Sequence, residues 1–287
     1  MTSKRVVLLA VVAVSLVLPF TGFGLLFSTA SSTPVSLGAA APFAVLANTG
    51  ITNTGFTTIT GDVGTAIAPE SGFGTVTLIG TNYGVGSSTV TTAETDLSAA
   101  IVEADGYSPA TILTALDGQT LVAGVYTSAS GAFTLSGGVL TLNGQDNPDS
   151  VWIFQVPDGI AGALSTTGGS VVLENEAQAC NVFWVTSAGG ATIGTYTTFV
   201  GRIMAYTSVT LGTGTILNGA ALASTGDVTM DGNTISVPTC ATTSTTSTTS
   251  TTTSTPVPEF PFGLFAVFAI TLPVFIFLVR VRRPSSK

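Results

Sequence analysis

Three stretches of seven residues repeat at a step of eighteen: TYTTFVG (195–201), TGTILNG (213–219) and DGNTISV (231–237). In this register one apolar column is formed by Phe199, Leu217 and Ile235. A short repeat rich in Gly, Thr and β-branched residues is typical of one coil of a β-solenoid, whose stacked coils share a core. About six residues for each side of a coil allow three short sides. The sequence therefore predicts a triangular β-solenoid with apolar columns inside and Thr, Ser and Asn columns outside.

The chain before these repeats is interrupted by a different periodicity. Most of it alternates short apolar groups with Gly, Thr and Asn turns, a pattern that predicts strands. Residues 88–106 instead contain no Gly or Pro before Gly106, and they predict an amphipathic helix of about five turns. Its apolar stripe consists of Val90, Ala93, Leu97, Ala100, Ile101 and Ala104, and the other side carries Glu94, Asp96, Glu103 and Asp105. We expect the apolar stripe to pack on a flank of the solenoid.

Charge is scarce between the two ends of the chain. Arg202 is the only Lys or Arg between Val6 and Val279, whereas all 15 acidic residues lie in that interval. Nucleic acid is excluded as a partner, because phosphate binding needs a basic surface. The chain has no His, and it has no Lys between residues 6 and 279, which argues against acid–base catalysis and predicts a non-enzyme without a cofactor. The acidic turn at 146–149 is interpreted as a solvated loop, because the spacing needed for a calcium site is incomplete.

The N-terminus, residues 1–30, has the pattern of a secretory signal peptide. Lys4 and Arg5 precede an apolar run at 6–17, and small residues at 28–30 offer a cleavage site. The alternative is a retained N-terminal anchor. Both interpretations place the main domain outside the cytoplasm.

The C-terminus predicts attachment to a membrane. Residues 260–279 form an uncharged span long enough to cross a bilayer, and the Arg residues at 280, 282 and 283 predict that this end stays inside. Residues 241–257 are mostly Thr and Ser and predict a stalk, either O-glycosylated or bare. Pro258, Glu259 and Phe260 open a tail (258–287) that resembles the Pro-Glu-Phe C-terminal sorting signal of archaeal surface proteins. That resemblance implies a sortase-like processing enzyme; the alternative is a plain transmembrane anchor.

The two cysteines, Cys180 and Cys240, both lie in the exported region. An even number of cysteines in an oxidising compartment predicts one disulfide. The alternative, a metal site or a reactive thiol, is disfavoured because the chain has no His and neither cysteine has another nearby in the sequence.

Five stretches in order along the chain resemble the microbial ice-binding protein family: 37–46, 59–64, 151–155, 179–184 and 231–235. The resemblance covers Leu37 to Cys240. It implies a discontinuous, right-handed β-solenoid of triangular section with a long α-helix packed along one side. It also implies an interleaved stack, in which the N-terminal strands complete the pile after the helix returns the chain.

The family resemblance further implies a flat face that binds an ice crystal, often through a Thr-Ala/Gly-X-Thr/Asn pattern. Tyr196, Ile216 and Asp231 depart from this pattern. The candidate ice-binding residues carried over to this chain are Thr54, Thr57, Thr167, Ser170, Thr195, Thr197, Thr198, Thr213, Thr215, Asn233 and Thr234. The alternative is a structural or adhesive surface protein, because outward Thr columns also follow from strand propensity alone.

Overall fold

The computed structural model describes residues 33–108, 110–156 and 164–241. The predictions for residues 1–30, for 258–287 and for nearly all of the stalk at 241–257 therefore lie outside the described residues. Among the residues described, no helix combines the length and the apolar character needed to cross a bilayer.

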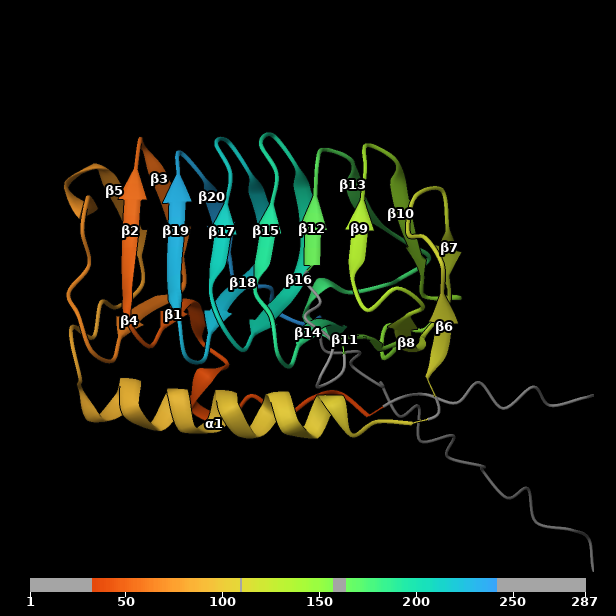
Figure 1. The fold of residues 1–287 in the computed structure, drawn as a ribbon, viewed down its shortest axis with the longest axis horizontal. Coiled ribbons are helices and arrows are strands. Elements are labelled where there is room, and N and C mark those ends of the chain that lie inside the picture. Colours follow the sequence, from red (N-terminus) through yellow and green to blue (C-terminus); the bar gives the residue numbers. More distant parts are fainter. Residues whose placement is uncertain (1–32, 109, 157–163, 242–287) are drawn as a thin grey trace, which may run out of the picture. The chain divides into compact units, whose positions relative to one another are not determined.

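Parallel strands stacked in rows form most of the described chain (Figure 1). The smaller sheet has the order β2 (Gly50–Thr54), β19 (Asp227–Asp231), β17 (Val209–Leu211), β15 (Ala191–Ile193), β12 (Leu164–Thr166) and β9 (Phe133–Leu135). The larger sheet follows the path β5 (Val76–Ile79), β3 (Thr57–Thr60), β20 (Thr234–Ser236), β18 (Ile216–Ala223), β16 (Thr198–Ala205), β14 (Val182–Thr186), β11 (Trp152–Val156), β8 (Gly124–Ser128) and β6 (Thr111–Leu113). Branches of it are β1 (Phe43–Ala47), β4 (Asp62–Thr65), β7 (Thr120–Leu121), β10 (Val139–Asn143) and β13 (Ser170–Glu174).

The eighteen-residue step is confirmed by strand pairing. β16 and β18 pair without a break from Thr198 opposite Ile216 to Ala205 opposite Ala223. The first part of β16 also pairs with β13 and its second part with β14, so this long strand belongs to two rows. Together with the smaller sheet, the two parts of the larger sheet give each coil three rows of strands. The apolar column of the repeats is buried as predicted.

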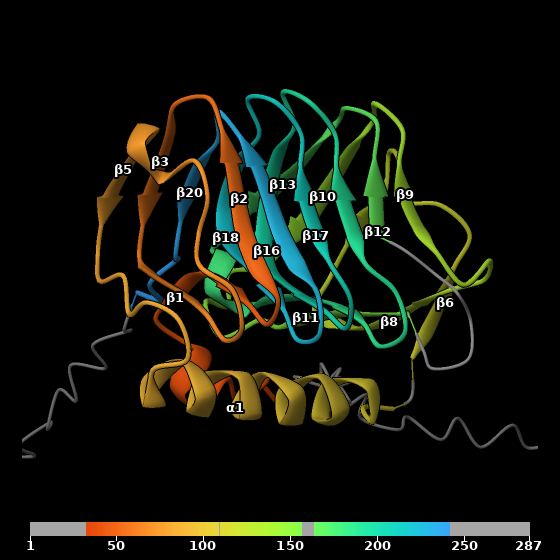
Figure 2. The ribbon, with the colours of Figure 1, turned by 60° about the vertical axis from the view of Figure 1, so that its left-hand side comes forward.

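The stack is interleaved, as the family resemblance implied. β2 pairs with β19, β1 with β18 and β3 with β20, so the first strands of the chain lie beside the last ones. Figures 1 and 2 show this as orange strands next to blue ones. The chain then passes along the whole stack through the helix α1 (Ser88–Asp105) and builds the other end first.

The predicted helix is confirmed, and Figure 2 shows it running along the stack. The side chain of Ser87 caps its N-terminus by accepting a hydrogen bond from the Val90 N–H at 3.3 Å. All six residues of the apolar stripe are buried against β1, β11, β14 and β16. The expectation that the four acids lie together on the solvent side is wrong in part. Both carboxyl oxygens of Glu94 are buried, and Asp96 accepts the Ala39 N–H at 2.7 Å.

Aromatic rings form a continuous stack inside the solenoid. The rings of Phe154 and Trp184 lie parallel with centroids 3.9 Å apart, and Tyr126 and Phe199 extend the stack on either side. The Trp184 indole N–H donates to the Val200 carbonyl at 2.9 Å, which satisfies its polar group inside the core. Trp152 is fully buried too. Both tryptophans are therefore core residues.

The predicted disulfide joins Cys180 to Cys240. Cys180 belongs to the short 3-10 helix η3 (Ala179–Asn181), one of three with η1 (Gly38–Ala40) and η2 (Phe73–Thr75) among the described residues. The bond ties the segment after β20 to a coil near the middle of the stack. Its sequence separation of 60 residues corresponds to about 4 kcal/mol of stabilisation in the chain-entropy treatment.

Candidate functional site

The outer surface of the smaller sheet carries a straight column of hydroxyl side chains. Side chains alternate between the two faces of a strand, so the central residue of each strand points outward when its neighbours are buried. Strand pairing places these outward residues opposite one another in the order Thr52, Thr229, Thr210, Thr192, Ser165 and Thr134. Every rung of the smaller sheet thus presents a Thr or Ser, with a spacing of about 4.8 Å set by the strands.

A second column runs beside the first, where each coil leaves the smaller sheet. It contains Thr54, Asp231, Thr213, Thr195 and Thr167, which are exposed except for the half-buried Asp231. Backbone hydrogen bonds of 2.8–3.0 Å hold successive coils together at this level, from Gly232 N–H to Thr54, from Gly214 N–H to Asp231 and from Tyr196 N–H to Thr213. We call the two columns together the threonine array.

The hydroxyls of the array differ between its two ends. Six of them make no side-chain hydrogen bond to any described residue and are free to bind water: Thr210, Thr192, Ser165, Thr134, Thr195 and Thr167. On β19, in contrast, Asp227 accepts hydrogen bonds from Ser208 at 2.6 Å and from Thr229 at 3.2 Å. The array is therefore neutral on β17, β15, β12 and β9 and charged on β19.

The second acid on β19, Asp231, accepts a hydrogen bond from a hydroxyl of the array itself. The hydroxyl of Thr213 donates to Asp231 and is the main cause that holds the pKa of this carboxyl below the ordinary value of 3.8. The nearby Thr54 hydroxyl, which donates to the Met230 carbonyl at 3.3 Å, contributes less. Asp231 is consequently ionised at neutral pH, and the donor capacity of Thr213 is consumed within the protein.

The candidates predicted from sequence divide into three groups. Thr54, Thr167, Thr195 and Thr213 lie on the threonine array. Exposed or half-buried residues of the next row are Thr234, Thr198 and Ser170, whose column is interrupted by the apolar Ile216.

The remaining four candidates, Thr57, Thr197, Thr215 and Asn233, are buried, with exposed fractions of 0–1%. Their predicted exposure on the face is wrong. The backbone explains the error, because each of them directly follows or closely follows a residue of positive φ at the corner of a coil, such as Tyr196 or Gly214. The polar side chain that follows points inward and forms hydrogen bonds to other groups at the corner of the coil. For example, the Thr215 hydroxyl lies 2.9 Å from both the Gly194 and the Gly212 carbonyl oxygens.

The central column of the array was missed by the sequence reasoning. A signal for it was available in the alternation of apolar and polar residues. Triplets such as Ala191-Thr192-Ile193 and Val209-Thr210-Leu211 repeat at the same eighteen-residue step as the seven-residue stretches. The Thr-Ala/Gly-X-Thr/Asn pattern directed attention to the corners instead, where half of the polar residues turn inward.

These features define a class of protein: a parallel β-solenoid that acts through a regular outer surface. The described residues of this surface offer an ordered array of hydroxyls. The chain belongs to the Ice-binding-like family, whose model matches residues 45–236.

Known proteins of this family resemble the chain over most of its length. An ice-binding protein of Nostoc sp. (strain HG1) is 33% identical over 227 residues, which cover 77% of this chain and 81% of the relative. The crystal structure of an ice-binding protein from an Antarctic biological consortium has a TM-score of 0.69 and 36% identity, and the match covers 74% of this chain and 94% of that one. The crystal structure of the ice-binding protein of the Antarctic ascomycete Antarctomyces psychrotrophicus has a TM-score of 0.66 and 39% identity, and the match covers 72% of this chain and 100% of that one.

Proposed function

We propose that this protein binds ice through the threonine array, and that it does so without catalysis or a cofactor. The observation that carries the proposal is the set of registered, unbonded hydroxyls on β17, β15, β12 and β9. Relatives that are 33–39% identical to this chain are named ice-binding proteins, which supports the proposal.

Threonine suits the binding of an ordered water layer. Its hydroxyl hydrogen-bonds water, its methyl group leaves neighbouring water caged, and β-branching restricts χ1. Each contact is weak, but an array held by a hydrogen-bonded sheet loses little conformational entropy when it binds. The neutral rungs add no charge that would disorder the bound water. The array thereby supplies a rigid template with a rung spacing of about 4.8 Å.

The proposal extends to the place of action. We propose a right-handed triangular solenoid displayed on the cell surface, exported by residues 1–30 and attached through the tail at 258–287. That tail acts either as an archaeal-type sorting signal or as a plain anchor through the span at 260–279. Protease treatment of intact cells, followed by detection of the domain in the medium or on the membrane, tests this location. Recovery of the intact domain in the cytoplasmic fraction would refute it.

The ice-binding proposal is tested by tyrosine substitutions on two rows of the solenoid. Thr192→Tyr and Thr210→Tyr place a ring in the middle of the array, so we expect both to abolish partition into ice and inhibition of recrystallisation. Thr234→Tyr puts the same ring on the adjacent row and serves as the matched control, with activity retained. Retained activity in Thr192→Tyr and Thr210→Tyr would assign ice contact to another surface, and equal loss in all three variants would show that the contact surface is not confined to the threonine array. No activity in the unmodified protein would favour a structural or adhesive role.

A further inference from the structure

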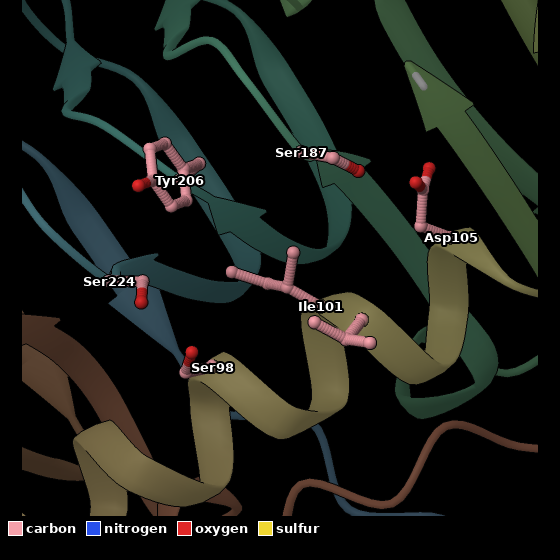
Figure 3. A pocket seen from close by; sticks show the side chains of 7 residues that line it. Ser98, Ile101, Asp105, Ser187, Tyr206 and Ser224 are labelled. Carbon is pink, nitrogen blue, oxygen red and sulfur yellow. The ribbon is translucent and has the colours of Figure 1, made fainter. Parts of the chain in front are cut away.

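A second feature lies between α1 and the solenoid, lined by none of the residues of the threonine array. It is a cavity of about 150 Å³ (Figure 3). The helix contributes Ser98, Ile101, Val102 and Asp105, and the solenoid contributes Ser187, Tyr206 and Ser224. The three solenoid residues occupy the same corner of successive coils, since each follows one of the paired residues Thr186, Ala205 and Ala223.

The polar groups around this cavity lack partners within the protein. The side chains of Ser98, Tyr206 and Ser224 make no hydrogen bond to a described residue. The Ser187 hydroxyl and one oxygen of the Asp105 carboxylate are buried without a partner. Ser187 is only 8% exposed, and its side chain lines the cavity. By contrast the neighbouring Thr186 hydroxyl donates to the Gly189 carbonyl at 2.9 Å.

Buried polar groups without partners cost free energy, so the Ser187 hydroxyl and the buried Asp105 oxygen point to a ligand that supplies hydrogen bonds. Three hydroxyls that are exposed or half-buried, those of Ser98, Tyr206 and Ser224, bring the number of polar groups without a partner at this cavity to five. Four of the five are hydroxyls, which both donate and accept, and the fifth is an acceptor carboxylate. An ammonium ion would only donate and would leave the hydroxyl hydrogens unmatched. An anion is disfavoured because no Lys or Arg lines the cavity. Ile101, Val102 and the Tyr206 ring add apolar surface for C–H groups.

We infer that this cavity binds a small neutral polyhydroxyl compound, either a free polyol or a single sugar unit of a glycan. The volume of about 150 Å³ equals that of roughly five waters, well below the ~300–1,000 Å³ of drug-sized pockets. A ligand of this size is one short polyol or one sugar ring. With so few atoms, its Kd falls in roughly the millimolar range.

The test titrates the full-length protein with glycerol, with methyl α-D-glucoside and with tetramethylammonium chloride, followed by saturation-transfer difference NMR. We expect glycerol or the glucoside to bind in the millimolar range. Binding of glycerol alone indicates a free polyol, and binding of the glucoside indicates a sugar unit. Ser187→Ala removes one hydroxyl from the cavity and Asp105→Asn replaces one acceptor oxygen by a donor NH₂, and we expect each to raise the Kd by roughly fivefold. Ser88→Ala, an exposed serine on the same helix, is the control and leaves the Kd unchanged.

A second measurement locates the ligand in the unmodified protein. Nuclear Overhauser contacts from the ligand C–H groups to the Tyr206 ring and the Ile101 methyls are expected, whether or not the variants fold. The inference is overturned if neither polyol binds, if only the tetramethylammonium ion binds, or if a bound polyol shows no contact to these two residues. Because the array is untouched in every variant, ice binding serves as an independent readout.

Discussion

Replacing Glu94 by Gln should remove most of the pH dependence of this protein's stability. Glu94 lies on α1 with both carboxyl oxygens buried and without a partner. Burial raises the pKa of its carboxyl from 4.5 to about 8. The helix therefore packs on the solenoid with a carboxyl group that resists ionisation.

The sign and size of the effect follow from linkage. A carboxyl with a raised pKa in the folded state costs nothing below its unfolded pKa, and it destabilises increasingly as the pH rises from there toward the folded pKa. At 1.36 kcal/mol per pH unit, raising the pH from 5 to 8 lowers the free energy of unfolding by about 4 kcal/mol. This is an upper value, since the side chain of Glu94 is not wholly shielded from water.

Thermal unfolding followed by circular dichroism between pH 5 and pH 8 measures this effect. At about 2–4 °C per kcal/mol for a domain of this size, the unmodified protein should lose roughly 10 °C in Tm over the range. Glu94→Gln should stay nearly level, whereas Glu174→Gln, which changes an exposed glutamate, should follow the unmodified protein. A Glu94→Gln variant whose Tm falls as steeply as that of the unmodified protein would refute the reasoning.

Three further predictions concern the array and the framework of the solenoid. Asp231→Thr should strengthen ice-affinity partition, because it removes a charge and frees the Thr213 hydroxyl; weaker partition would show that the acid takes part in binding. Thr215→Val should lower the free energy of urea unfolding by about 1–3 kcal/mol, because it removes the side-chain donor of the Gly194 carbonyl at the corner; an unchanged midpoint would contradict this. Cys240→Ser should cost about 4 kcal/mol in the same assay by releasing the loop closed with Cys180, and a variant as stable as the unmodified protein would reject the entropic account.

Most of the fold could be predicted because it rests on regular spacing. The step of eighteen residues fixes which apolar residues stack, so the column of Phe199, Leu217 and Ile235 was predicted without coordinates and is confirmed. The helix was predicted because the apolar residues of 88–106 recur at helical spacing, which differs from the alternation typical of strands. Pairing of the first strands with the last depended on resemblance, because nothing local to β2 indicates its partner.

The candidate site was harder to predict because the alternation of inward and outward side chains is interrupted at the corners of the coil. Thr195 and Thr197 are both polar and two residues apart, yet the first is exposed and the second fully buried. Between them Tyr196 has a φ of 54°, a left-handed conformation rarely taken by residues other than glycine. Sequence patterns contain little information about such a turn when a tyrosine occupies it. Within the straight strands the alternation of buried and exposed residues is regular, so triplets such as 191–193 and 209–211 would have been enough to predict the central column of the array.

The pairing of β2 with β19 also affects how the molecule can be made. During synthesis the strands at residues 43–79 leave the ribosome long before their partners at 216–236 exist. The edges of β1, β2 and β3 stay unpaired during this time, so the N-terminal coil cannot complete its sheets until the last segment has been translated. Truncation before β20 would likewise remove the strand between β18 and β3 and leave β3 without its partner, although β1 would still pair with β18 and β2 with β19.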